Sequence, residues 1–90
     1  MNKLFLILIP IDANRDELIK YLSTSGYSTF WFYSFPSSFF VRSNYSAAQL
    51  QTFIRTKFPT VDKIFITQIT KAVDLSGQVP DAHVQYFNNI

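Results

Sequence analysis

The chain has 90 residues, of which 48% are hydrophobic, 18% are aromatic and only 16% are charged, and its formal net charge is +2. A chain this short has room for one core, so we expect residues 1–90 to form a single domain, and the aromatic content excludes an intrinsically disordered protein. The absence of cysteine excludes a disulfide scaffold and a thiolate metal site, and it fits a reducing cytoplasm.

The first predicted element is a buried strand over Lys3–Ile9, because both alternating sets of residues are apolar. The run also resembles the start of a signal peptide, but Pro10 follows it in place of a small-residue cleavage site. Spanning a membrane takes about 20 apolar residues, far more than this run supplies. We therefore favour a central strand, and we expect a cytoplasmic protein with no membrane partner.

A helix is predicted next, over Arg15–Ser25. Asn14 and Glu17 have the spacing of a capping box at its start, and Gly26 is a natural end because glycine accepts the left-handed conformation. One apolar stripe follows at intervals of three and four residues, made by Leu18, Tyr21 and Leu22.

The next two elements are strands that form a hairpin. Tyr27–Phe35 is rich in aromatic residues, which favour strands. Phe39–Arg42 also begins with aromatic and β-branched residues and is predicted as the next strand. The turn between them is predicted at Pro36, because proline cannot donate a ladder hydrogen bond.

A second helix and a last strand complete the pattern. Ser46 and Gln49 repeat the capping-box spacing, and Pro59 ends the helix. Its apolar residues again fall at helical spacing, at Leu50, Phe53, Ile54 and Phe58. The β-branched stretch Val61–Ile69 is typical of a strand.

The order strand, helix, strand, strand, helix, strand predicts an α+β, ferredoxin-like βαββαβ fold. We expect a four-stranded antiparallel sheet with both helices on one face. A short C-terminal segment should follow, as a loop or extra strand at Val73–Gln78 and a helix at about Asp81–Asn89.

Neither face of this predicted sheet alternates in the way that a solvated face would. In the first strand Leu4, Leu6 and Leu8 oppose other apolar residues, and in the second strand both alternating sets are mostly aromatic. Apolar patches larger than a few hundred Å² usually mark an interface. We therefore expect something to cover the face that has no helices.

Three candidates could cover this face: the C-terminal helix, a second copy of the chain packed sheet to sheet, and single-stranded nucleic acid stacked on the aromatic rings. The C-terminal helix has too few apolar residues to cover the whole face, so we favour a homodimer. The residues that we expect at the dimer or partner interface are Trp31, Tyr33, Phe35 and Phe40.

The stretch from Trp31 to Val41 resembles the strand hairpin of SinR-like small proteins, with aromatic residues, a serine at the turn and an aromatic and aliphatic third strand. These proteins are similar to the small, non-integrase subunit of the CRISPR spacer-acquisition complex. Ser46–Leu50 resembles the start of their second helix, and Gln78–Ala82 resembles their ending. Asp12 matches their aspartate at the exit of the first strand.

The resemblance implies a ferredoxin-like homodimer with face-to-face sheets, in which the strand-exit aspartates approach each other across the two-fold axis. Some of the CRISPR-associated relatives are metal-dependent nucleases, and others hold DNA as scaffolds. Those relatives usually carry tyrosine before the aspartate, where this chain has Pro10 and Ile11, and basic residues are sparse here. We therefore lean toward a protein that is not an enzyme.

Asp12 is the candidate for catalysis and for a Mg²⁺ site, because hard cations prefer carboxylate oxygens. The other interpretation, which we favour, is a turn residue that satisfies backbone groups. We thus expect no cofactor, with Mg²⁺ needed only if the chain is a nuclease. The candidates for contacts with nucleic-acid phosphates are Arg42, Arg55, Lys57 and Lys63. His83 is the only histidine, which excludes a histidine metal cluster within one chain.

These observations predict a non-enzymatic, homodimeric interaction module that binds a protein partner or regulates a nucleic-acid machine. The alternative is a nucleic-acid-binding protein or a Mg²⁺-dependent nuclease similar to the small spacer-acquisition subunit. A small-molecule sensor has no positive support in the sequence.

Overall fold

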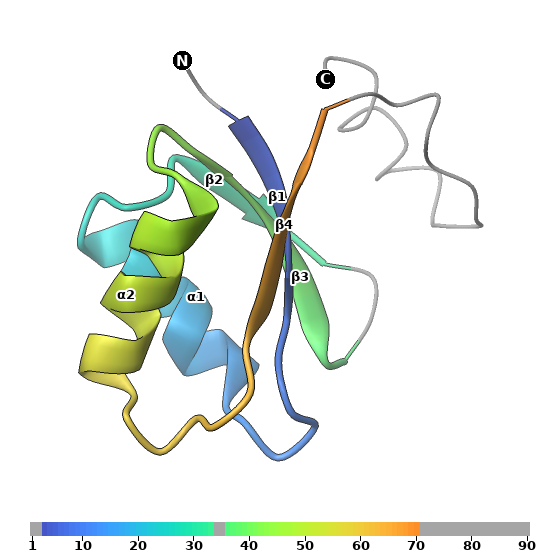
Figure 1. Ribbon diagram of the computed structural model, residues 1–90, viewed down its shortest axis with the longest axis vertical. Helices are drawn as coiled ribbons and strands as arrows, with labels where there is room; N and C mark the ends of the chain where they lie inside the picture. The colour runs from blue at the N-terminus through green and yellow to red at the C-terminus, as the bar shows by residue number, and fades with distance from the viewer. Residues whose placement is uncertain (1–2, 34–35, 71–90) are drawn as a thin grey trace.

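Strands and helices follow one another in the predicted order, β-α-β-β-α-β (Figure 1). The computed structural model describes residues 3–33 and 36–70. The elements are β1 (Lys3–Leu8), α1 (Arg15–Thr24), β2 (Phe30–Phe32), β3 (Ser38–Ser43), α2 (Ala47–Lys57) and β4 (Phe65–Ile69). The expected C-terminal segment, with Val73–Gln78 and Asp81–Asn89, lies outside the described residues.

The four strands form one sheet in the order β2-β3-β1-β4. The central strand β1 pairs antiparallel with both β3 and β4, and β2 pairs antiparallel with β3, so β2 and β4 are the edges of the sheet that the described residues form. Both helices lie on the same side of this sheet (Figure 1). This is the ferredoxin-like arrangement that the sequence predicts.

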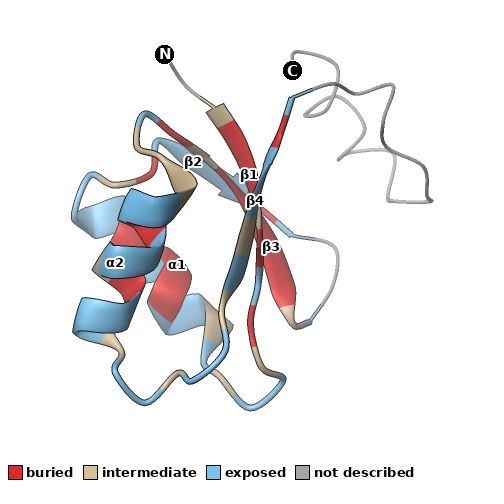
Figure 2. Cartoon of the chain, viewed as in Figure 1, coloured by how far each residue is buried: buried red, intermediate tan, exposed pale blue. Residues whose placement is uncertain are grey.

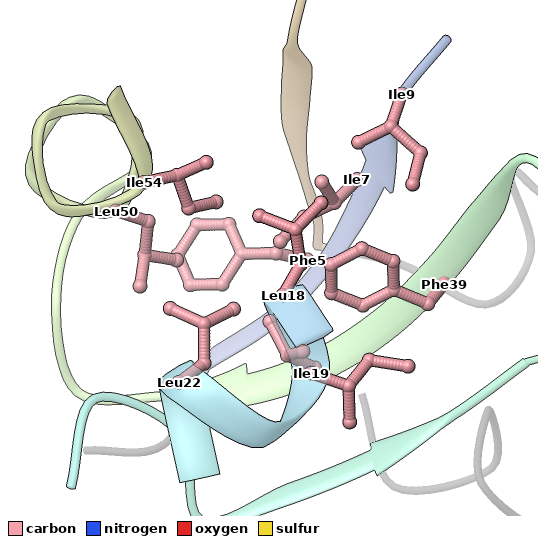
Figure 3. Close-up of a cluster of buried hydrophobic side chains, with 10 residues drawn as sticks. Phe5, Ile7, Ile9, Leu18, Ile19, Leu22, Phe39, Leu50 and Ile54 are labelled. Carbon is pink, nitrogen blue, oxygen red and sulfur yellow. The ribbon is translucent and has the colours of Figure 1, made fainter. Parts of the chain in front are cut away.

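The main core lies between the sheet and the two helices. Phe5 and Ile7 of β1 are fully buried and lie between the helices and the neighbouring strands (Figure 3). The stripes predicted on the helices supply the opposite wall. The buried members of the core are Phe5, Ile7, Ile9, Leu18, Ile19, Leu22, Phe39, Val41, Leu50 and Ile54. Each large side chain buried here contributes roughly 1.5–3 kcal/mol, so this core is the main source of stability.

The capping residues determine where the helices begin. The side-chain oxygen of Asn14 accepts a hydrogen bond of 3.2 Å from the backbone N–H of Glu17. At α2 the capping box is reciprocal, because Ser46 Oγ accepts from the Gln49 N–H at 3.1 Å and the Ser46 N–H donates to Gln49 Oε1 at 2.9 Å. Within the described residues, no helix has the length and apolar character needed to cross a membrane.

The strand β2 is much shorter than predicted, because the chain after α1 still wraps the end of that helix. Gly26 has φ of +76°, and the backbone N–H groups of Tyr27 and Ser28 both donate to the Leu22 carbonyl oxygen, at 2.9 and 3.1 Å. Pairing with β3 begins only at Phe30. The prediction of a strand from Tyr27 was therefore wrong. The ring of Tyr27 packs against the main core.

The strand β4 also starts later than Val61, at Phe65. The backbone N–H of Val61 donates to the Phe58 carbonyl oxygen at 3.1 Å, which closes a turn after α2. Residues 61–64 of the predicted strand therefore connect this turn to the sheet.

Candidate functional site

The sheet face without helices is mostly apolar, as the sequence predicts. The strand register places Leu4 opposite Ile69, Leu6 opposite Phe40, and Leu8 opposite Phe65 on this face. The residues of the face are Leu4, Leu6, Leu8, Phe30, Phe32, Ser38, Phe40, Arg42, Phe65, Thr67 and Ile69. We call this set the helix-free face.

Four residues of the helix-free face are buried. Leu4, Phe32, Phe40 and Ile69 have exposed fractions of 2, 4, 7 and 8%, and they form a second apolar cluster with Leu6. The rings of Phe32 and Phe40 stack at 4.7 Å between centroids with an interplanar angle of 9°. This cluster holds the edge strand β2 to β3 from the side opposite the helices.

The part of the helix-free face at the start of β4 is exposed, and this start is pale blue in Figure 2. Leu8 and Phe65 face each other across β1 and β4, and they are 41% and 65% exposed. Ile11, in the turn after β1, is 85% exposed. Leu8 and Phe65 form what we call the Leu8–Phe65 patch. The alternation of side chains along β1 and β4 could have placed Leu8 and Phe65 on the same face of the sheet. It could not have predicted that both side chains are exposed.

The four residues predicted at an interface do not share one surface. Trp31 pairs with the core residue Val41 and so projects to the helix side, whereas Phe40 belongs to the helix-free face and is buried. Tyr33 follows Trp31 by two residues and stacks on it. Phe35 lies outside the described residues. Trp31 and Tyr33 are therefore candidates for a surface of their own, beside α1.

That second surface is a short ladder of flat groups. The rings of Trp31 and Tyr33 are nearly parallel, with 5.7 Å between centroids and 6° between planes. The guanidinium carbon of Arg15, the first residue of α1, lies 3.7 Å from the centroid of the Tyr33 ring. Trp31 is 42% exposed and Tyr33 37%. Stacking and the cation–π contact hold these groups in one orientation while their surfaces stay accessible. No pattern in the sequence predicts a surface role for Arg15.

The predicted basic residues are spread over several surfaces. Arg55 of α2 and Lys63 line the same hollow of about 430 Å³ beside the end of β1. Lys57 lines a different hollow with Lys20 of α1. Arg42 lies on the helix-free face, opposite Phe30. These four side chains do not combine into one basic track for a phosphate backbone.

Asp12 lies exposed in the turn after β1. It lines a hollow of about 340 Å³ together with Glu17 and Asp62. Within the described part of the chain, no three carboxylate or histidine groups come close enough to hold a metal ion.

Comparison of the chain with protein-family models, with curated proteins and with solved structures finds no match.

Proposed function

We propose that this chain is a homodimeric interaction module without enzymatic activity, which binds a protein partner or regulates a nucleic-acid machine. The observation that carries the proposal is the Leu8–Phe65 patch. Two large apolar side chains face each other across neighbouring strands, and 41% of Leu8 and 65% of Phe65 stay exposed. A second copy offers the same patch under two-fold symmetry, so the two patches cover each other.

The position of the patch favours contact between copies through one end of the sheet. At the other end Leu4 and Phe40 are already buried, at 2% and 7% exposed. Leu8 and Phe65 thus supply the exposed apolar surface at this end, and Phe30, which is 38% exposed, lies on the same face at the edge strand β2. Contact there is compatible with the face-to-face sheets that the family resemblance implies, with the register shifted toward this end.

We expect the protein to have twice the mass of one chain in light scattering at high micromolar concentration. Phe65→Glu should give the mass of one chain, because each patch would then bury an unpaired carboxylate. Since Phe65 is 65% exposed in a single chain, this substitution leaves the core intact. Gln68→Glu is the matched control, because Gln68 is an exposed residue of the same strand that lies on the other side of the sheet.

A single-chain mass for the unmodified protein at every concentration would contradict the homodimer. A dimer that persists in Phe65→Glu would place the contact elsewhere. Co-purification from the native host then tests the second half of the proposal, because it captures a protein or nucleic-acid partner without assuming its class.

A further inference from the structure

The hollow of about 430 Å³ beside the end of β1 adjoins the Leu8–Phe65 patch, because Leu8 and Phe65 both line it. These two residues are the last pair between β1 and β4, so the hollow lies where the two chains leave the ladder. Its apolar lining consists of Leu8, Ile9, Pro10, Val61, Ile64 and Phe65. The hollow therefore continues the apolar surface of the patch past the end of the sheet.

Two cationic side chains lie at this hollow. Arg55 of α2 and Lys63 both line it, and both are exposed. Within residues 3–33 and 36–70, neither cation takes part in an ion pair. Asp62 also lines the hollow, which leaves its lining with one net positive charge. The hollow, which we call the basic hollow, thus suits an apolar group that carries a carboxylate beside it.

The turn after β1 presents such a pair of groups. Ile11 is 85% exposed, more than any other large hydrophobic residue in the described part of the chain, and the next residue, Asp12, is exposed as well. Asp12 lines the hollow of about 340 Å³ with Glu17 and Asp62, and no cationic side chain of the described residues lines that hollow with them. A cation supplied by another molecule would therefore offset the repulsion among these carboxylates.

The exposed turn and the basic hollow are neighbours in the structure. Pro10 lines the basic hollow, and Ile11 follows Pro10 directly but does not line the hollow of its own chain. A two-fold axis close to Pro10 would exchange the two features, because it brings the turn of each copy to the hollow of the other. The contact is then made twice in one dimer.

We propose that Ile11 of each copy enters the basic hollow of the second copy, with Asp12 placed beside Arg55 and Lys63 of that copy. The inference rests on the proposed homodimer and specifies its contact, since Leu8 and Phe65 line the hollow that receives Ile11. A free anionic ligand would use the two cations but leave Ile11 in water. A second copy covers Ile11, the hollow and the charges together, which is why we infer this occupant.

The apolar half of the contact is tested at Ile11 by sedimentation velocity over a range of protein concentrations. Ile11→Ser should raise the dissociation constant of the dimer by about tenfold or more, because each dimer loses two buried aliphatic side chains. Ile11→Val keeps an aliphatic side chain and should stay within about twofold of the parent. Circular dichroism should show the parent fold in both variants, because Ile11 is 85% exposed in a single chain.

The charged half is tested by charge reversal at low ionic strength. Asp12→Lys should raise the dissociation constant by about tenfold, because it places a cation beside two others. Addition of Arg55→Glu or Lys63→Glu to Asp12→Lys should restore association, because opposite charges then meet again. Lys20→Glu makes the same charge change on the exposed side of α1 and should not restore it. Failure of both Arg55→Glu and Lys63→Glu to restore association would overturn the proposal.

The outcomes separate this contact from the homodimer itself. Loss of the dimer in Phe65→Glu, together with unchanged dissociation constants in Ile11→Ser and Asp12→Lys, would retain the homodimer and overturn the entry of Ile11 into the basic hollow. A single-chain mass for the unmodified protein at every concentration would contradict both.

Discussion

At the scale of single residues, Tyr27 links more of the structure than its position after a helix suggests. Its ring stacks on Phe53 of α2 at 3.9 Å between centroids, and it meets the rings of Tyr21 and Tyr45 edge to face at 5.8 and 5.5 Å. Its carbonyl oxygen also accepts a hydrogen bond from the hydroxyl of the fully buried Ser43. Tyr27 therefore joins both helices to the end of β3.

Replacement of Tyr27 should accordingly be costly. We expect Tyr27→Ala to lower the free energy of unfolding by about 3 kcal/mol, because it removes a large ring from a packed cluster. Tyr27→Phe keeps the ring and should change the stability by less than about 1 kcal/mol. Urea unfolding followed by circular dichroism measures both. Equal stability of the two variants would show that the ring cluster does not support the fold.

At the scale of elements, the start of α2 depends on a capping box. Ser46 and Gln49 satisfy each other's backbone N–H groups through two hydrogen bonds of 3.1 and 2.9 Å. The first turn of α2 contains no acidic residue to favour the helix dipole, so the capping box is its main local stabilisation.

We expect Ser46→Ala to lower the free energy of unfolding by about 1 kcal/mol, since the substitution leaves a backbone donor of the first turn without its side-chain partner. Thr52→Ala serves as the control, because Thr52 is exposed in the middle of α2 and alanine is the better helix former there. Chemical denaturation of the two variants beside the parent tests this. A loss as large in Thr52→Ala would show that the cap is not the cause.

The elements differ in how far the sequence predicts them. Helix starts follow from short-range signals, so Asn14 and Ser46 could be identified in advance. The late start of β2 depends on two backbone hydrogen bonds to the Leu22 carbonyl oxygen. No residue type in the sequence predicts these two bonds. The exposure of Phe65 and the stack of Arg15 on Tyr33 also escape prediction, since both depend on how elements distant in sequence lie together.

At the scale of the whole molecule, the two sides of the sheet have different roles. The helix side contains the main core, with the aromatic ladder at its margin beside α1. The helix-free face contains a smaller buried cluster and the exposed Leu8–Phe65 patch. The proposed association would thus use the helix-free face, on the side of the sheet opposite the main core.

If association stabilises the fold, the thermal midpoint should depend on concentration. We expect the midpoint to rise by about 5 °C over an approximately hundredfold increase in protein concentration, because dimer formation favours the native state by mass action. Phe65→Glu should remove this dependence. A midpoint that is independent of concentration in the unmodified protein would indicate that folding does not require the second copy.

The composition of the edge strand β4 affects how the protein behaves during storage. Its sequence, Phe-Ile-Thr-Gln-Ile, contains no charge and no proline, which is the composition of segments that stack into amyloid fibrils. Lys63 lies two residues before this strand, where a positive charge hinders the stacking of identical segments. Neutralisation of Lys63 would therefore remove a gatekeeper, and long incubation of such a protein would favour fibres over crystals.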